Sequence, residues 1–170
     1  DVPLLRVYCS EHVHSSIDKS VITLGLGLRS LRKIACNERF EIIPEQLAEA
    51  INDDIENGLL PICVIPTIGT TSTSSVDPVE AIADICEKHG IWLHVDTAYA
   101  GSTAILPEFR HHFKGCERAD SIVVNPHKWL FTPFDLSVLY CKDLNALKDA
   151  FSLVPEYLKT SGEPPVKNGM

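Results

Sequence analysis

Short apolar runs alternate along the chain with segments whose apolar residues recur at helical spacing. The runs are rich in Val, Ile and Leu on consecutive positions, which is typical of strands buried on both faces. We expect strands at 4–8, 32–35, 61–65, 91–95, 121–124 and 136–141.

Helical patterns separate most of these runs. One apolar face is formed by residues spaced four, three and four apart, namely Ile17, Val21, Leu24 and Leu28. A second helix is expected from Pro44, which suits a first helical turn, to Gly58. The tail at 159–170 is rich in Gly, Pro and Lys, and we expect it to be unstructured.

A third helix is expected to begin after Asp77 and to end at Gly90. Asp77 has the position of an N-cap, Pro78 the first helical position, and Glu80 lies three residues after the cap. A last helix is expected to follow Asp143.

This alternation predicts an α/β fold with an open, mainly parallel sheet and helices on both faces. Ligands of such sheets bind at the carboxyl ends of the strands. Polar clusters at 9–16, 67–75, 94–102 and 125–128 follow or end predicted strands. We therefore expect the chemistry of the protein at that one edge.

Composition narrows the class of protein. The chain has 170 residues, 45% of them hydrophobic and 22% charged, which fits a single globular domain. A net charge of −8 argues against a nucleic-acid partner, which needs clustered Lys and Arg. The longest apolar stretches are too short to cross a bilayer, so no membrane partner is expected.

The cysteines favour a reducing compartment. Six of them lie more than twenty residues apart, and no CxxC motif occurs. The chain is also larger than the small secreted scaffolds that depend on disulfides. We expect a cytoplasmic protein.

Lys128 is the first candidate for chemistry, because it comes soon after the apolar run at 121–124. A lysine that is partly desolvated at a sheet edge more readily offers a neutral, nucleophilic amine. Asn125, His127 and Trp129 beside it favour a site over an ordinary surface lysine, without deciding the matter.

Asp96 is the second candidate, since it ends the apolar run at 91–95. A carboxylate in such a place needs a cationic or hydrogen-bonding partner. From spacing alone, a helix cap, a metal ligand and a cofactor contact are all open.

Together these segments resemble the pyridoxal-phosphate-dependent group II amino-acid decarboxylases, and within them the aromatic L-amino-acid decarboxylases. The matching segments are HSS at 14–16, TIGTT at 67–71, HVDTAYAGS at 94–102, PEFRH at 107–111, ADS at 119–121 and NPHKW at 125–129. Each is weak alone, and their combination is specific. The resemblance implies that residues 1–158 form the central part of a fold type I cofactor-binding large domain.

The resemblance implies roles for three catalytic residues. Lys128 is expected to hold pyridoxal 5'-phosphate covalently, and Asp96 to pair with the pyridine nitrogen. His14 is expected to stack on the cofactor ring near the substrate carboxylate. An anion beside the pyridine nitrogen keeps that nitrogen protonated, as an electron-accepting ring requires.

Four more residues are implied to contact the cofactor. Ala98 is expected on the ring face opposite His14, Asn125 and His127 at the phosphate, and Thr67 beside the cofactor and His14. Thr97 departs from the family, which usually carries alanine there; the change adds a hydroxyl near Asp96.

The implied activity is decarboxylation of an aromatic L-amino acid to its amine and CO2 by a full-length homodimer. Subunits of this family are several hundred residues long, so we expect weak cofactor capture and no turnover from this segment alone. Aromatic aldehyde synthases share the same segment and remain an alternative.

Two alternatives come from other classes. His12 and His14 alternate along one extended segment, as His94 and Asp96 do along another, and such a set suits a metal-dependent hydrolase. A non-catalytic interaction module would keep the fold and lose the chemistry; the presence of Lys128, Asp96 and His14 argues against it.

Overall fold

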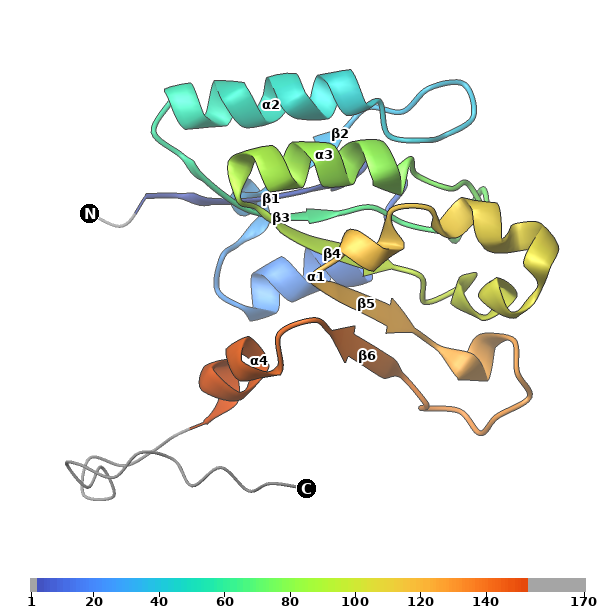
Figure 1. Ribbon diagram of the computed structural model, residues 1–170. Coiled ribbons are helices and arrows are strands. Elements are labelled where there is room, and N and C mark those ends of the chain that lie inside the picture. The colour runs from blue at the N-terminus through green and yellow to red at the C-terminus, as the bar shows by residue number, and fades with distance from the viewer. Residues whose placement is uncertain (1–2, 153–170) are drawn as a thin grey trace, which may run out of the picture.

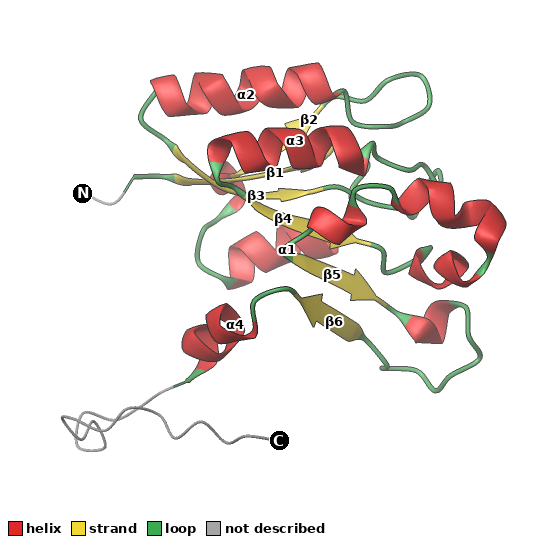
Figure 2. Ribbon diagram, viewed as in Figure 1, coloured by secondary structure: helices red, strands yellow, loops and turns green. Residues whose placement is uncertain are grey.

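A computed structural model describes residues 3–152 of the chain. The tail expected at 159–170 and the end of the expected 1–158 domain lie outside the described residues. The strands are β1 (Leu5–Ser10), β2 (Leu31–Ile34), β3 (Leu60–Ile65), β4 (Trp92–Asp96), β5 (Ser121–Val124) and β6 (Val138–Cys141). The α-helices are α1 (Ser16–Thr23), α2 (Pro44–Glu56), α3 (Val79–His89) and α4 (Leu144–Phe151) (Figures 1 and 2).

The six strands form one sheet in the order β2-β1-β3-β4-β5-β6 (Figure 1). All neighbours are parallel except β6, which runs antiparallel to β5. The predicted open, mainly parallel α/β sheet is confirmed. Short 3-10 turns between 101 and 118 make the crossover from β4 to β5, where no α-helix is formed.

Both faces of the sheet are covered, and each has its own core. Tyr8 of β1 packs into the core that α2 and α3 cover, together with Leu47 and Ile82. Its neighbours Val7 and Cys9 point to the opposite face, as strand geometry requires, and pack with Val21 of α1. In Figure 1 the helices α2 and α3 lie on one side of the sheet and α1 on the other.

The helical face expected over 17–28 is shorter than its spacing indicates. The helix α1 ends at Thr23, and the glycines that follow it have positive φ, 76° at Gly25 and 75° at Gly27. Leu24 and Leu28 are 73% and 55% exposed. That part of the prediction is wrong, because the glycines turn the chain before a third helical turn forms.

The capping role predicted for Asp77 is also wrong. The N-cap of α3 is Pro78, and no side chain caps this helix. Asp77 is buried, and its two carboxylate oxygens accept backbone N–H groups from Ile42 and Thr67, each at 2.8 Å. The carboxylate therefore joins the segment before α2 to the chain just after β3.

A second buried carboxylate, Asp54, fastens α2 to the sheet. The Tyr8 hydroxyl donates to Asp54 Oδ2 at 2.8 Å, and the Arg32 guanidinium lies 2.8 Å from Oδ1. Arg6 Nε is 3.4 Å from the same oxygen. Burial and the bond to Asp54 raise the pKa of Tyr8, so its hydroxyl stays a donor.

Replacing Asp54 should destabilise the protein strongly. In Asp54→Ala the Tyr8 hydroxyl and two guanidinium groups lose their shared acceptor, and we expect a loss of about 3–5 kcal/mol in the free energy of unfolding. Asp53→Ala is the matched control, because Asp53 is exposed and its contacts, an ion pair with Arg32 and a hydrogen bond from Asn57, lie at the surface; it should cost no more than about 1 kcal/mol. Urea denaturation measures both, and equal losses would show that the buried network around Asp54 does not stabilise the fold as described.

Asp77 should give the stability a distinct dependence on pH. Burial raises the pKa of its carboxyl to about 6, although both backbone bonds and His12 act in the other direction and Glu41 adds to the rise. The folded state therefore binds this proton more tightly than the unfolded state, whose pKa is ~3.9. Stability from this group is fully present below pH 4 and is lost as the pH rises through 6, by about 3 kcal/mol in all.

The measurement compares the wild type with Asp77→Asn by chemical denaturation from pH 4 to 7. The asparagine variant cannot titrate, so the wild-type free energy of unfolding minus that of the variant should fall over this range. A difference that stays flat or rises would show that Asp77 is ionised throughout.

Candidate functional site

The parallel strands bring the polar clusters to one edge of the sheet, as expected. β1, β3, β4 and β5 point the same way, and each neighbours the next in that order. The segments that leave their carboxyl ends carry His14, Thr67, Asp96 with Ala98, and 125–128, respectively. In Figure 1 the arrowheads of these strands point toward the same side of the molecule.

Backbone pairing between β3 and β4 continues past the end of β3 and sets Thr67 beside Asp96. The Asp96 N–H donates to the Pro66 carbonyl, and the Ile68 N–H donates to the Asp96 carbonyl, both at 2.9 Å. Thr67 and Asp96 are register partners in a parallel bridge. Their residues are 5% and 8% exposed, so the pair is buried and rigidly placed.

The Thr67 hydroxyl is an unsatisfied polar group. Its Oγ1 is buried, and no described residue makes a hydrogen bond to it. A buried hydroxyl without a partner costs free energy, and each such case in a native fold calls for an explanation. A ligand with a polar atom at this position would satisfy it.

The carboxylate of Asp96 is held by its own turn. Oδ1 accepts the N–H of Ala98 at 2.9 Å. Among the described residues no bond is made to Oδ2 or by a cation to this carboxylate, so one oxygen remains for a protonated ring nitrogen. Thr97, the departure from the family pattern, donates its hydroxyl to the Val123 carbonyl at 2.6 Å and is buried inside the sheet.

Lys128 lies in a 3-10 turn directly after β5, and it is exposed, so the partial desolvation expected from its place at the sheet edge is not found within this chain. The turn is tied to the rest of the site: the Asn125 N–H donates to the Ala98 carbonyl at 3.3 Å, and the Lys128 N–H donates to the Asn125 carbonyl at 3.0 Å. No described side chain pairs with the Lys128 amine. The neighbouring placement of β4 and β5 therefore brings Asp96 and Lys128 to adjoining strand ends.

Asn125 and His127 are both partly engaged by the segment that leads into β6. Ser137 Oγ donates to Asn125 Oδ1, and His127 Nδ1 donates to the Leu136 carbonyl, each at 2.8 Å. These bonds leave the Asn125 amide group and the second nitrogen of His127 free. The Asn125 amide group can donate to an anion such as a phosphate, and Nε2 of His127 can do so only when the ring carries a proton on both nitrogens.

His14 is exposed at the same edge, and its tautomer follows from its bonds. The Ser16 N–H donates to His14 Nδ1 at 3.2 Å, so this nitrogen is an acceptor, and Ser16 Oγ lies 2.9 Å from it. The proton of a neutral imidazole is then on Nε2. The described contacts do not join His14 to Thr67 or Asp96, so stacking on a cofactor ring stays a prediction.

An apolar cavity of about 560 Å³ is lined in part by Trp129, the residue after Lys128, and no pattern in the sequence indicated it. Tyr99, Phe109 and Trp129 contribute to its lining, and the Tyr99 and Trp129 rings meet edge to face at 5.4 Å between centroids. A cavity lined by aromatic and aliphatic side chains suits an apolar ligand group. Only the folded chain brings 68–76, 99–112 and 129–130 together around it.

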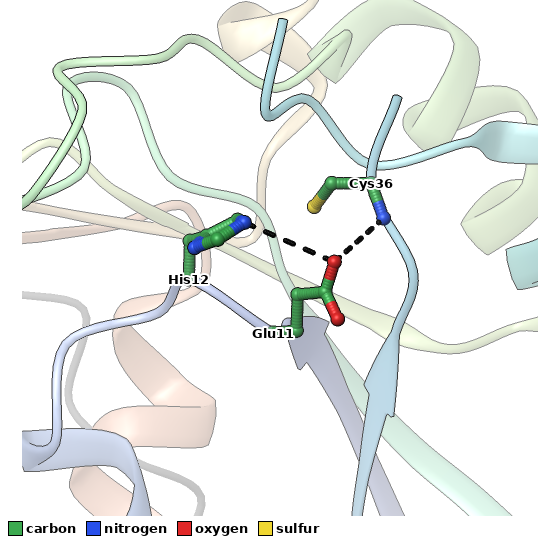
Figure 3. A group of neighbouring side chains, drawn as sticks. All are labelled: Glu11, His12 and Cys36. Carbon is green, nitrogen blue, oxygen red and sulfur yellow. Dashed lines mark hydrogen bonds and ion pairs between the residues drawn. The ribbon is translucent and has the colours of Figure 1, made fainter. Parts of the chain in front are cut away.

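The four-ligand metal alternative is not formed. Burial lowers the pKa of His94, and its Nδ1 lies 2.8 Å from Ser121 Oγ. Within residues 3–152, metal-ligating atoms of three or more residues converge only at Glu11, His12 and Cys36 (Figure 3). Of the four proposed ligands this cluster contains only His12.

Comparison with known proteins identifies the relatives of this fold and site. A model described as "Pyridoxal-dependent decarboxylase conserved domain" matches residues 3–166. Aromatic-L-amino-acid decarboxylase of Manduca sexta is 45% identical over 152 residues, which are 89% of this chain and 29% of that protein. Phenylacetaldehyde synthase of a Rosa hybrid cultivar is 42% identical over 157 residues, 91% of this chain and 31% of that protein.

A solved structure agrees with these sequence matches. A crystal structure of Oryza sativa TDC with PLP and tryptamine has a TM-score of 0.86 at 43% identity, and the match covers 92% of this chain and 31% of that chain. The chain thus spans about three tenths of the length of the relatives it matches. The predicted resemblance and the predicted cofactor, pyridoxal 5'-phosphate, are confirmed, and the chain belongs to the pyridoxal-dependent decarboxylase family.

Proposed function

We propose that this chain is the central part of the cofactor-binding domain of a longer protein that decarboxylates an aromatic L-amino acid. The observation that carries the proposal is the unsatisfied, buried hydroxyl of Thr67 beside the Asp96 carboxylate. Asp96 ends β4, which lies between β3, the strand before Thr67, and β5, the strand before Lys128. This donor set fits a phosphorylated pyridine aldehyde.

Each residue has a definite task toward the cofactor. The Lys128 amine would hold the cofactor covalently through its aldehyde group, as a nucleophilic amine can. Asp96 holds a proton on the ring nitrogen through its unoccupied oxygen. The Thr67 hydroxyl donates to a polar atom of the ring substituents, and Ala98 packs on the ring. Asn125 and His127 bind the phosphate.

When bound, pyridoxal 5'-phosphate supplies a conjugated cation that accepts the electron pair left on the alpha carbon as CO2 departs. His14 presents its Nε2–H to the substrate carboxylate side and limits the tilt of the ring. The apolar cavity beside Trp129 excludes water from the site and receives an apolar substrate group.

The names of the relatives support an aromatic substrate. They differ in the product that they indicate, which is an amine for most and an aldehyde for others. Most of the names concern decarboxylation of tryptophan, tyrosine or DOPA, whereas the Rosa relative is named for an aldehyde. We favour the amine, because His14 occupies the position where decarboxylases carry histidine. The longer protein is proposed to act as a homodimer.

Two findings bear on where the protein works. All six cysteines are free thiols, which supports the proposed cytoplasmic location. Within residues 3–152, no helix combines the length and apolarity that crossing a membrane requires.

The lysine assignment is tested by trapping the cofactor. After borohydride reduction of the full-length protein, the wild type should retain pyridoxal phosphate covalently on the peptide that contains Lys128, whereas Lys128→Ala should retain none. Lys142→Ala is the control, since this exposed lysine lies just after β6 at the opposite end of the sheet. Mass spectrometry locates the adduct, and an undiminished adduct in Lys128→Ala would refute the assignment.

The proposed reaction is tested by product analysis. The full-length protein, loaded with cofactor and given tyrosine, DOPA, tryptophan or phenylalanine, should release CO2 and the matching amine in equal amounts. Chromatography with mass detection measures the amine. Stoichiometric aldehyde with ammonia would establish the synthase alternative, and no turnover of any aromatic substrate by cofactor-loaded protein would support the interaction module.

A further inference from the structure

We infer that Glu11, His12 and Cys36 form a binding site for a zinc ion, beside the cofactor site and separate from it. The ligand atoms of the three residues lie within 4.8 Å of one another. They come from two segments, the turn after β1 and the chain just after β2 (Figure 3). Thiolate, imidazole and carboxylate are the three ligand types that zinc takes in proteins.

The backbone already fixes the two segments against each other. β1 and β2 are parallel neighbours with Ser10 opposite Ile34, and the Glu11 N–H donates to the Ile34 carbonyl at 3.1 Å. The Cys36 N–H donates to Glu11 Oε1 at 3.2 Å, which orients the carboxylate and leaves Oε2 free. The ligands therefore need no rearrangement of the sheet.

One of the separations between the ligand atoms is close to that of a tetrahedral site. His12 Nε2 and Glu11 Oε1 are 3.8 Å apart. Zinc–ligand bonds of 2.0–2.3 Å imply ligand separations of roughly 3.3–3.6 Å. The His12 and Glu11 side chains are 31% and 50% exposed, so a small shift of the more exposed Glu11 side chain can close the remaining gap. Three protein ligands on an open surface leave the fourth position to water.

The surroundings of the ligands support metal binding as well. Ser10 Oγ lies 3.1 Å from Cys36 Sγ and accepts the His12 N–H at 2.9 Å, so one buried hydroxyl adjoins two of the ligands. The His12 ring packs edge to face on Phe40 at 5.2 Å, which restricts its rotation. Binding is a simple exchange: the Cys36 thiol loses its proton to solvent as the zinc–sulfur bond forms.

Zinc binding is measured on the full-length protein after removal of metal, by equilibrium dialysis and by competition with a chromophoric chelator. We expect one zinc ion per chain. Loss of a residue that only supports a ligand costs about 10- to 100-fold in metal affinity, so loss of a ligand itself in Cys36→Ser, His12→Gln or Glu11→Gln should cost more. Cys141→Ser and His111→Gln are the controls and should bind as the wild type does.

A second readout distinguishes site occupancy from damage to the fold. With zinc present, alkylation of Cys36 by iodoacetamide should slow, while alkylation of Cys141 should not, as peptide mass spectrometry reports. Absence of stoichiometric zinc in the wild type, or unchanged affinity in Cys36→Ser, would overturn the inference. So would equal labelling of Cys36 with and without zinc. Borohydride trapping of the cofactor on Lys128 is read separately and tests the proposed function alone.

Discussion

Two backbone hydrogen bonds past the end of β3 are the constraint on which the site depends. They pair the Thr67 segment with Asp96 after β3 has ended, and so keep a hydroxyl and a carboxylate side by side in the interior. The Asp77 carboxylate adds a third bond, to the Thr67 N–H, from the loop before α3. Because three backbone contacts converge on these two residues, the backbone of Thr67 is held in the interior, where its hydroxyl is buried and unsatisfied.

The sheet was predictable because its strands have a clear local pattern. Apolar runs such as 61–65 and 91–95 mark buried strands, and parallel order then places their carboxyl ends together. At Asp77 the structure departs from the predicted helix cap because of a contact with a residue far away in the sequence. Asp77 has the sequence context of an N-cap, but its partner Ile42 lies 35 residues away and outcompetes the helix end. Local spacing cannot reveal such a partner.

The candidate site also has one part that the sequence predicts and another part that only the tertiary structure reveals. Lys128, Asp96 and Thr67 belong to short segments that can be recognised in the sequence, and the fold brings their strands together. The unpaired state of Thr67 Oγ1, the cavity beside Trp129 and the meeting of Cys36 with His12 depend on tertiary structure. Alternation along the sequence suggested His12 as a metal ligand together with His14, whereas the fold pairs it with a cysteine that follows the neighbouring strand.

The functional edge of the sheet thus has two parts that meet at one segment. The strands β3, β4 and β5 hold the residues proposed for the cofactor, and β1 and β2 hold the inferred zinc ligands. His14 follows two residues after His12, so both parts depend on the turn that leaves β1. That turn is anchored by the Val13 N–H to the Ser10 carbonyl at 3.1 Å and by the start of α1. Zinc on one side and the cofactor on the other would hold His14, an exposed histidine, between two fixed points.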